Sequence, residues 1–352
     1  MVRDDKLNLG IIGCGWATAN LHLPALRRVP GCTVVALADM ELPRAQEFGR
    51  RLGIRHCFSD AADVITHPKV DAVAVCVPPD DHARLTIAAI QEGKHVFIEK
   101  PMTLMIDQAD RIAELALRTN LKVMVGFNLR WHRLILQAKG MLDDRRLGSL
   151  ALMRTVFTNA LRHDDDMPAW RRDRSRGGGV IQDLAVHHFD LWRFLLSTEV
   201  QEIFVAARSE RWQDEAAVIS ARMADGMLVS SVFADGTSEN HELECYGDAG
   251  RLQVSCYRYD GLHSSSRQRS SFLTGLVHDA ASKVMALPHA IRQMRRGGEI
   301  AASYDAQWRH FLNCIRNGAQ VGCTVEDGRR AVNLAVAATE SLVTGQPIGV
   351  KP

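Results

Sequence analysis

Two patterns in the sequence predict an α/β fold followed by an α+β fold. In residues 1–127, short apolar runs alternate with helical patterns, which is typical of a doubly wound parallel sheet. In residues 128–352, strand patterns follow one another and are linked by turn residues, which is typical of a large, open and mainly antiparallel sheet. We therefore expect two domains, at residues 1–127 and 128–352, and a C-terminal helix that can pack back on the first domain.

The first domain should contain five buried parallel strands. Near-continuous apolar runs predict them at residues 7–12, 33–38, 72–77, 95–98 and 122–125. Helical periodicity lies between these runs, at residues 19–28, 42–52, 81–91 and 106–119. This order of strands and helices makes the βαβ series of a Rossmann fold.

The second domain should be built mostly from strands. Strand patterns occupy residues 150–159, 200–209, 216–223, 227–234, 242–247 and 252–256. Turn residues at 224–226 and 247–250 predict hairpins between consecutive strands. Helices are predicted at residues 180–196, 306–317 and 325–343, and the first of them follows a Gly177-Gly178-Gly179 run that we expect to be flexible.

Composition is that of an ordinary globular chain. Of the 352 residues, 46% are hydrophobic and 24% are charged, and the net charge of +2 does not favour a nucleic-acid partner. The N-terminal pattern is not that of a signal peptide, and no apolar stretch is long enough to span a bilayer. The eight cysteines have no C-x-x-C spacing, which argues against a zinc ribbon. We therefore expect a cytoplasmic protein, and membrane binding is not favoured.

One segment fits neither domain pattern. Residues 258–299 are rich in serine, contain an amphipathic run at 276–294, and carry seven Lys or Arg against three Asp or Glu. An inserted loop and helix with a solvated basic face explains this composition. The alternatives are an anionic substrate, a partner chain or a membrane surface. We expect the segment to cover part of the substrate mouth or a neighbouring subunit, since about 40 residues are too few for a core of their own.

A glycine turn follows the first predicted strand. In Gly13-Cys14-Gly15, the first glycine permits the tight turn and the second lets a pyrophosphate approach the backbone at a helix N-terminus. The third position of this G-x-G-x-x-G pattern is Thr18, so we expect the helix and the strand to lie slightly further apart. A lone G-x-G is weak evidence, and a second feature must support it.

Asp39, at the end of the second predicted strand, supplies that feature. Its carboxylate can accept hydrogen bonds from both hydroxyls of an adenosine ribose. The next residues, Met40 and Glu41, offer no adjacent Arg for a 2′-phosphate, so we expect NAD rather than NADP. The alternative role for Asp39 is the N-cap of the helix at 42–52.

The residues expected to bind the dinucleotide are Gly13, Gly15, Trp16, Ala17, Asp39, Pro78, His82, Glu99 and Asn128. The loop of Val77-Pro78-Pro79 should cross the edge of the nicotinamide ribose, and His82 opens the helix after it. For His82, a solvated position in the first helical turn is an equally good interpretation.

A carboxylate and an amine stand directly after a predicted buried strand, in Glu99-Lys100-Pro101. Ligands bind at the carboxyl ends of strands in open α/β sheets, which makes Lys100 a candidate to hold a substrate oxygen.

Asp183 and His187 are four residues apart on a predicted helix and so share a face. A carboxylate on one ring nitrogen sets the tautomer, and the other nitrogen can then take a proton from a hydroxyl. A structural hydrogen bond is the alternative for this pair, but together with Lys100 it predicts oxidation of a secondary alcohol.

Other side chains have the chemistry to contact a polyol or sugar. The candidates are Arg130, Trp170, Arg171 and His188. Indole rings offer flat apolar surface and guanidinium groups offer donors, although buried Trp and surface Arg is the equal alternative. Asp190 is expected to make structural hydrogen bonds. The Asp-rich run at 163–166 has no second ligand cluster nearby, so we expect an exposed acidic loop and no metal.

Together these residues give the chain a family likeness. The resemblance rests on six runs of residues: Gly13-Cys14-Gly15, residues 75–79 with His82, Glu99-Lys100-Pro101, residues 126–130, Trp170-Arg171, and the run from Gly177 through Asp183 and His187 to Asp190. They resemble the glucose–fructose oxidoreductase, inositol dehydrogenase and rhizopine-catabolism (Gfo/Idh/MocA) family across nearly the whole chain. The resemblance implies a Rossmann domain, an α+β domain for substrate binding and oligomerisation through its open sheet, and a homodimer or homotetramer.

The resemblance also implies roles and an activity. The family's catalytic Lys, Asp and His fall on Lys100, Asp183 and His187. The implied activity is NAD(P)-dependent hydride transfer between the nicotinamide and a secondary hydroxyl or ketone of a sugar, sugar derivative or cyclitol. The positive charge of residues 258–299 allows this substrate to be anionic. The alternatives are an NAD-assisted glycosidase and a non-catalytic dinucleotide-binding regulator. Departures from the family pattern are Thr18, Ala185 and the bulky Trp16 beside the glycine turn.

Overall fold

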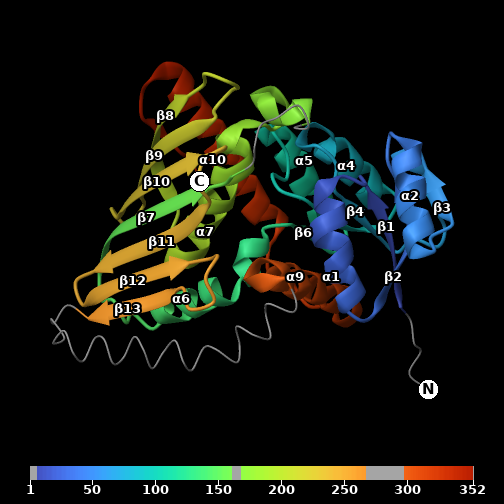
Figure 1. Cartoon of the computed structure of the whole chain (residues 1–352), viewed down its shortest axis with the longest axis horizontal. Coiled ribbons are helices and arrows are strands. Elements are labelled where there is room, and N and C mark those ends of the chain that lie inside the picture. Colours follow the sequence, from blue (N-terminus) through green and yellow to red (C-terminus); the bar gives the residue numbers. More distant parts are fainter. Residues whose placement is uncertain (1–5, 161–167, 267–296, 352) are drawn as a thin grey trace. The chain divides into compact units, whose positions relative to one another are not determined.

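The computed structural model describes residues 6–160, 168–266 and 297–351 (Figure 1). The chain forms two compact units. The first unit comprises Met1–Phe127, Ser175–Gly177 and Tyr304–Val332, and the second comprises Asn128–Arg174, Gly178–Ser303 and Asn333–Pro352. Each unit therefore combines segments that are far apart in the sequence.

A six-stranded parallel sheet forms the centre of the first unit. Its strands are β1 (Leu7–Ile12), β2 (Cys32–Ala38), β3 (His56–Phe58), β4 (Ala72–Val75), β5 (His95–Ile98) and β6 (Val123–Val125). They lie in the order β3-β2-β1-β4-β5-β6, which is that of a doubly wound Rossmann sheet. The predicted fold class of this part is confirmed. In such sheets ligands bind where the strand order reverses, which here is between β1 and β4.

Short helices connect the strands of the first unit. They are η1 (Thr18–His22), α1 (Leu23–Arg28), α2 (Leu42–Leu52), α3 (Ala61–Ile65), α4 (His82–Gln91) and α5 (Ile106–Leu117). Every residue of β4 is buried, as expected for a parallel strand that is covered on both faces. Part of a later helix, α9 (Gly298–Asn317), joins this core: the fully buried Trp308 stacks on Phe97 of β5, with ring centroids 4.4 Å apart.

The sequence does not predict two short elements of this unit. β3 has three partly exposed residues at the edge of the sheet, and so it lacks the apolar run that marks the other strands. α3 is one turn long and is capped by Asp60, whose Oδ1 accepts a hydrogen bond from Ala62 N–H at 2.9 Å. The predicted strand at 72–77 ends earlier, at Val75. Elements this short depend on their neighbours rather than on their own periodicity.

An eight-stranded sheet forms the second unit. Its strands are β7 (Leu150–Thr158), β8 (Val200–Arg208), β9 (Ala216–Met223), β10 (Leu228–Ala234), β11 (Asn240–Gly247), β12 (Gly250–Ser255), β13 (Leu262–Ser266) and β14 (Ile348–Gly349). Their order is β13-β12-β11-β7-β10-β9-β8-β14. Only the β7–β10 pair among these is parallel, so the predicted, mainly antiparallel sheet is confirmed.

Among the residues that the structure describes, helices cover one face of this sheet and none covers the other (Figure 1). Residues of α6 (Arg133–Asp143), α7 (Val186–Leu196) and α10 (Val325–Thr344) share a hydrophobic core with alternate strand residues. Buried and exposed residues alternate along β9, as they do in a sheet with one solvated face. The large apolar side chains exposed on the strands are Leu152, Phe204, Val218, Leu228 and Val232.

Among the α-helices and strands that the structure describes in the second unit, local patterns do not predict α6, β13 or β14. β14 has two residues, and its pairing with β8 through Ile348 and Ile203 defines it. β13 pairs with β12 inside the segment that we expected to be an inserted loop, so the start of that segment is a strand instead. The amphipathic run at 276–294 lies outside the described residues.

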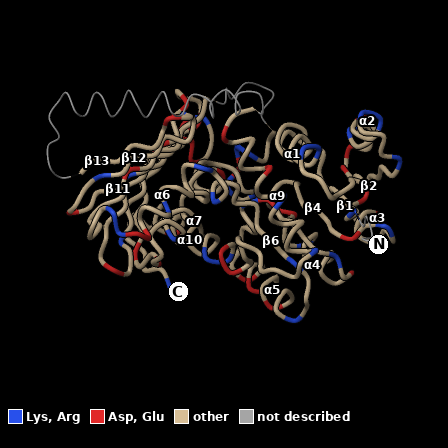
Figure 2. The backbone as a smooth tube through the Cα atoms, turned by 90° about the horizontal axis from the view of Figure 1, so that it is seen from below, with Lys and Arg blue, Asp and Glu red and all other residues tan. Residues whose placement is uncertain are grey.

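Charges of both signs are interspersed along both units (Figure 2). This distribution agrees with the small net charge of the chain. Among the helices that the structure describes, none combines the length and the apolar character needed to cross a membrane.

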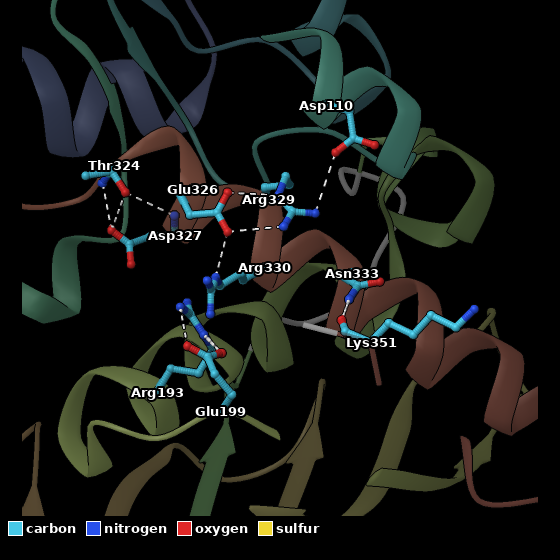
Figure 3. Close-up of polar contacts among 10 residues, drawn as sticks. All are labelled: Asp110, Arg193, Glu199, Thr324, Glu326, Asp327, Arg329, Arg330, Asn333 and Lys351. Atoms are coloured by element: carbon cyan, nitrogen blue, oxygen red, sulfur yellow. Dashed lines mark hydrogen bonds and ion pairs between the residues drawn. The ribbon is translucent and has the colours of Figure 1, made fainter. Parts of the chain in front are cut away.

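Helix α10 begins with a reciprocal cap (Figure 3). The backbone N–H and the hydroxyl of Thr324 both donate to Asp327 Oδ2 at 2.8 Å, and Asp327 N–H donates to the Thr324 hydroxyl at 3.1 Å. Glu326 in the same turn accepts hydrogen bonds from Arg329 and Arg330. This exchange satisfies donors that a helix N-terminus leaves without intrahelical partners.

Replacing Thr324 with alanine should lower the free energy of unfolding by about 1 kcal/mol, because Asp327 N–H then loses its acceptor. Urea denaturation measures this change. The control is Thr324→Ser, which keeps the hydroxyl and should stay close to the wild type. Unchanged stability of the alanine variant would show that the cap does not stabilise α10.

Candidate functional site

The ends of three neighbouring strands carry the first group of candidate residues. β1, β4 and β5 are adjacent and parallel, and Gly13, Pro78 and Lys100 follow them in the chain. Because the carboxyl ends of parallel strands meet at one edge, these residues share the edge where Rossmann sheets bind ligands. Lys100 is half-buried there.

The glycine turn after β1 has the shape of a phosphate cradle. Gly13 has φ of +96°, and a Cβ on it would lie 2.3 Å from the Cys76 carbonyl oxygen, so only glycine fits. A Cβ on Gly15 would meet nothing within 4 Å, so the backbone is open on that side to a ligand. Thr18 is buried, and its hydroxyl donates to the Gly13 carbonyl at 2.6 Å, which ties the helix to the turn. The turn therefore fits the pyrophosphate of a dinucleotide.

Asp39 faces the glycine turn. Its Oδ2 accepts a hydrogen bond from Cys14 N–H at 2.8 Å and its Oδ1 accepts one from Glu41 N–H at 2.9 Å. Arg44 Nη1 lies 3.6 Å from the same Oδ1. The sequence shows no Arg directly after Asp39, but the first turn of α2 places Arg44 close to the Asp39 carboxylate. Trp16, 69% exposed, stands at the tip of the turn.

Glu99 is a buried carboxylate at the end of β5. Its Oε2 accepts a hydrogen bond from Lys100 N–H at 3.1 Å, and its Oε1 lies 3.0 Å from His22 Nε2. Gly126 leaves room for it, since a Cβ there would lie 2.9 Å from Oε1. Burial raises the pKa of Glu99, but His22 and Lys100 outweigh this effect and hold the pKa below its usual value. Glu99 thus holds the backbone at Lys100, and its contact with the dinucleotide stays a prediction.

His22 is a functional candidate that no sequence motif singles out. It is fully buried in η1, contacts Glu99 and the Cys76 thiol, and accepts a hydrogen bond at Nδ1 from the Trp308 indole at 3.2 Å. Burial lowers the pKa of His22, but the thiol and the carboxylate together raise it to about 10. The Trp308 N–H can only donate and favours the neutral ring. Because Nδ1 accepts from Trp308, the proton of the neutral ring is on Nε2, which lies 3.0 Å from Glu99 Oε1.

A signal for His22 does exist in the sequence. A histidine stands between two leucines, in Leu21-His22-Leu23, within the predicted helix after the glycine turn. A titratable group inside an apolar helical run needs a buried partner. The sequence does not reveal that this partner is Glu99.

His82 connects two loops of the first unit. The ring is buried, with Nδ1 2.7 Å from the Pro101 carbonyl oxygen and Nε2 2.9 Å from the Val77 carbonyl oxygen. Burial lowers its pKa. The interpretation of His82 as a solvated residue is therefore wrong, because the ring ties the loop after β4 to the loop after β5. Pro78 lies half-buried in the first of these loops.

In the second unit, Asp183 and His187 lie on a helix that is not uniform. A π-helical turn, η6 (Ile181–Ala185), carries Asp183, and α7 carries His187. The predicted helix at 180–196 is confirmed, and it begins with a π turn that the sequence pattern does not show. π turns occur frequently at functional sites because the wider turn re-aims its side chains. Asp183 is half-buried and His187 is buried.

Asp183 is bound by Arg171. Arg171 Nη2 donates to Asp183 Oδ2, and Asp183 and Asp235 together raise the pKa of Arg171. Asp235 in turn accepts a hydrogen bond from Asn159 Nδ2 at 2.6 Å. The Arg171 guanidinium lies 5.8 Å from the centre of the Trp170 ring. The structure thus brings the substrate candidates Trp170 and Arg171 together with the catalytic candidate Asp183.

The glycine run before η6 is packed rather than flexible, so that expectation is wrong. All three glycines are buried. A Cβ on Gly178 would lie 2.4 Å from the Arg171 carbonyl oxygen and 2.5 Å from that of Trp170. Gly179 has φ of +77°, which favours glycine. The absence of side chains here lets the segment with Trp170 and Arg171 lie against the start of the helix.

Arg130 and Asn128 are buried within the second unit. Arg130 Nε and Nη2 donate to the two carboxylate oxygens of Asp190, at 2.7 and 2.6 Å, which is the structural role expected of Asp190. Asn128 Nδ2 donates to Ser303 Oγ at 3.0 Å. The predicted ligand contacts of Arg130 and Asn128 stay predictions.

His188 lies in the core, although the sequence analysis makes it a substrate candidate. Its Nδ1 is 2.7 Å from Thr155 Oγ1, which is 2.6 Å from Ser231 Oγ, and its Nε2 is 3.1 Å from His241 Nε2. All four side chains are buried, and Phe157 stacks on His241 with ring centroids 4.1 Å apart. Two neutral imidazoles and two hydroxyls supply one donor and one acceptor for each contact. We therefore leave His188 out of the proposed substrate site.

Among residues 6–160, 168–266 and 297–351, no three or more His, Cys, Asp or Glu side chains form a group that could hold a metal ion. The acidic run at 163–166 lies outside these ranges.

The buried histidine pair should make the second unit sensitive to acid. Burial, and His187 to a lesser degree, lowers the pKa of His188 from 6.5 to about 3. Between these values the unfolded chain binds a proton that the folded chain does not, so the free energy of unfolding should fall by about 1.4 kcal/mol per pH unit as the pH falls. Urea denaturation at about pH 7 and about pH 5 tests this expectation.

The comparison that isolates the effect is His188→Gln, with the exposed His56→Gln as the control. His188→Gln removes the titrating group and should lose less stability on acidification than the wild type, whereas His56→Gln should behave like the wild type. Equal acid-induced losses in all three proteins would contradict the assignment.

The chain matches the models of both domains of one protein family. A model described as "Oxidoreductase family, NAD-binding Rossmann fold" matches residues 7–127. A second, described as "Oxidoreductase family, C-terminal alpha/beta domain", matches residues 139–350.

Relatives and solved structures cover nearly the whole chain. It is 25% identical to a myo-inositol 2-dehydrogenase of Thermotoga maritima over 343 residues, with 96% of each chain covered. It is 26% identical to a scyllo-inositol 2-dehydrogenase (NAD(+)) of Bacillus subtilis over 356 residues, with 99% of this chain and 96% of the relative covered. The fold is similar to that of the WlbA dehydrogenase from Bordetella pertussis in complex with NADH and UDP-GlcNAcA, with a TM-score of 0.84, 17% identity and 100% of both chains covered.

The two family models together account for both units, and the Rossmann sheet and the glycine cradle are both present. The chain therefore belongs to the Gfo/Idh/MocA family of oxidoreductases with an NAD-binding Rossmann domain, as its motifs predict.

Proposed function

We propose that this chain is a dehydrogenase that uses Lys100, Asp183 and His187 to act on a secondary hydroxyl of a sugar, sugar derivative or cyclitol, with NAD as the cofactor. The observation that carries this proposal is the placement of Lys100. It follows β5, one strand from the loop after β4 and two strands from the Gly13 turn, at the edge of the sheet that binds dinucleotides. Residues 1–127 would bind the dinucleotide, and residues 128–352 the substrate.

The chain's own residues then divide the work. Bound NAD supplies a hydride acceptor. The Lys100 ammonium holds the substrate oxygen, and Glu99, which accepts the Lys100 N–H, sets the backbone from which that side chain starts. His187 takes the hydroxyl proton on a ring nitrogen. Asp183 orients the base in the family pattern, and its Oδ2 accepts a hydrogen bond from Arg171.

The cofactor cradle consists of Gly13, Gly15, Trp16 and Ala17 for the pyrophosphate and Asp39 for the adenosine ribose. Pro78, His82, Glu99 and Asn128 complete the set of cofactor-binding candidates. Trp170, Arg171 and Arg130 remain the candidates for substrate binding. The two inositol dehydrogenases among the relatives support a polyol or sugar substrate.

We further propose a cytoplasmic homodimer or homotetramer. All eight cysteines are free thiols, which suits a reducing compartment. The open face of the second sheet supplies apolar surface for self-association. Val232 pairs with Val218 on one side and with Val156 on the other, and Leu228 pairs with Leu152. An exposed apolar row across paired strands is typical of an interface.

Lys100→Ala and His187→Ala should each retain NADH binding but lower kcat about 10²–10⁴-fold, because each removes a group that handles the reacting proton or oxygen. Stopped-flow or steady-state kinetics with a panel of polyols measure kcat, and a fluorescence titration measures NADH binding separately. Lys69→Ala, an exposed lysine of the same unit as Lys100, is the control. Near-normal turnover in either active-site variant would remove that residue from the mechanism.

Asp39 and Arg44 should set the choice of cofactor. Asp39→Asn keeps an acceptor for Cys14 N–H but removes the charge that repels a 2′-phosphate and leaves Arg44 to attract it. The ratio of kcat/KM for NADP to that for NAD should rise roughly tenfold, which corresponds to about 1.4 kcal/mol. Adding Arg44→Gln should reverse most of this gain. A wild type that already prefers NADP would overturn the role given to Asp39.

A further inference from the structure

His22 ends the π-helical turn that follows the glycine turn. This turn, η1, begins at Thr18, and both of its terminal residues are buried. The Thr18 hydroxyl ties the start of η1 to the Gly13 carbonyl, and at the other end His22 lies against Glu99, the residue directly after β5. η1 therefore contacts two of the loops that form the ligand-binding edge of the first unit.

A continuous chain of polar contacts runs from Trp308 through His22 to Lys100. The Trp308 indole N–H donates to His22 Nδ1 at 3.2 Å, and His22 Nε2 lies 3.0 Å from Glu99 Oε1. The other carboxylate oxygen, Oε2, accepts the Lys100 N–H at 3.1 Å. An indole can only donate, so the proton of the neutral imidazole is on Nε2, beside the carboxylate. One carboxylate thus lies between His22 and the backbone of Lys100.

The surroundings of this chain of contacts are aromatic and dry. His22 is fully buried, Glu99 is 8% exposed, and the imidazole packs edge-on against Phe97, Tyr304 and Trp308, with ring centroids 5.3–5.8 Å apart. A carboxylate in such a place is costly unless it is paired. Apolar residues of similar volume often give equal or greater stability than a buried polar pair. Stability alone therefore does not account for a histidine and a glutamate here.

His22 also affects the charge of Glu99. Burial raises the pKa of the Glu99 carboxyl, but the contacts with His22 and Lys100 hold it below its usual value. The other titratable groups near this pair, among those that the structure describes, are the Cys76 thiol beside His22 and the His82 ring, on which Glu99 acts electrostatically. Loss of the His22 contact would therefore raise the pKa of Glu99.

We propose that His22 is a positioning residue, which acts through Glu99 on the backbone from which the Lys100 side chain reaches the substrate oxygen. The proposal rests on the role of Lys100 in the proposed dehydrogenase. His22 is fully buried, so its effect passes through Glu99 and not through a direct contact with a ligand. An ionised carboxylate accepts the Lys100 N–H more strongly than a protonated one. A displacement of about 1 Å at a reacting group can slow turnover about 10²-fold.

Two variants of His22 test the proposal. His22→Leu removes both polar contacts and keeps an apolar side chain among the aromatic rings. His22→Gln keeps an oxygen for the Trp308 N–H and an N–H for Glu99. With a polyol substrate, kcat should fall about 10–10²-fold in His22→Leu and stay close to the wild-type value in His22→Gln. NADH affinity, from a fluorescence titration, should change less than kcat. Equal kcat in the two variants, or a loss confined to NADH affinity, would overturn the proposal.

Phe311→Leu is the control for a general loss of packing. Phe311 is fully buried in α9, and its ring lies against Phe97 and Trp308, with centroids 5.9 Å apart in both pairs. This variant should lower the Tm but leave kcat close to that of the wild type. A loss of kcat as large as that of His22→Leu would show that packing, and not the contact with Glu99, is responsible.

A double-mutant cycle tests whether His22 acts through Glu99. Glu99→Gln replaces one carboxylate oxygen by an amide nitrogen, so the side chain can no longer accept on both sides. Adding His22→Leu to Glu99→Gln should lower kcat far less than the same change does in the wild type, because the two residues share one interaction. Losses that simply multiply would contradict the proposed route.

A measurement without turnover tests the charge of Glu99. Urea denaturation gives the free energy of unfolding of His22→Leu and His22→Gln at about pH 8 and about pH 5. Neither variant has a titrating group at position 22, so the gap between them reports on Glu99. In His22→Leu the folded chain should bind a proton at Glu99 before the unfolded chain does, which stabilises this variant as the pH falls. In His22→Gln the pKa of Glu99 should stay low. The gap should therefore narrow on acidification, and a constant gap would overturn the effect assigned to His22.

The two proposals fail in different ways. If the gap narrows but the wild type forms no NADH with any polyol, the dehydrogenase proposal is wrong and the link between His22 and Glu99 stands. If the wild type and His22→Leu oxidise a polyol equally fast, the dehydrogenase proposal stands and the positioning role of His22 is wrong.

Discussion

The buried carboxylate of Glu99 is the contact on which the ligand-binding edge of the first unit depends. A carboxylate taken out of water must find partners, and here they come from the helix after β1, from the backbone after β5 and, through His22, from Trp308 of α9. The space for Glu99 exists only because residue 126 is a glycine. One carboxylate thus joins the end of β5 to the end of η1 and, through His22, to α9.

The same edge is shaped by contacts that exclude side chains. Gly13 must be a glycine because the Cys76 carbonyl occupies the place of its Cβ, and this approach brings the end of β4 against the turn after β1. Thr18 then ties the following helix back to Gly13 through its hydroxyl. The hydroxyl of Thr18 thus joins the helix to the turn by a buried hydrogen bond.

The second unit keeps its polar groups in balance by pairing them. Arginine–aspartate pairs and the His188–His241 contact are buried beside the residues proposed to act on the substrate. Such pairs are costly to break, because either partner alone would be an unsatisfied group in a low-dielectric core. They fix the π turn and the glycine run in one arrangement. A fixed backbone suits Asp183, which is proposed to orient the base that takes the proton.

The sequence alone determined the succession of most strands and helices along the chain. It also determined the glycine turn, the lysine after β5 and the Asp183–His187 spacing, because apolar periodicity and turn residues are local properties. Tertiary structure decided everything that depends on which distant groups meet. Arg44 reaches Asp39 only through the helix between them, His22 finds Glu99 across two strands, and His188 faces the core because β7 and β11 supply Thr155 and His241. The π turn at Asp183 and the packing of the glycine run were equally invisible to local patterns. A hydrogen bond or ion pair between distant residues leaves no periodic pattern in the sequence. The two residues that form it are therefore known only from the tertiary structure.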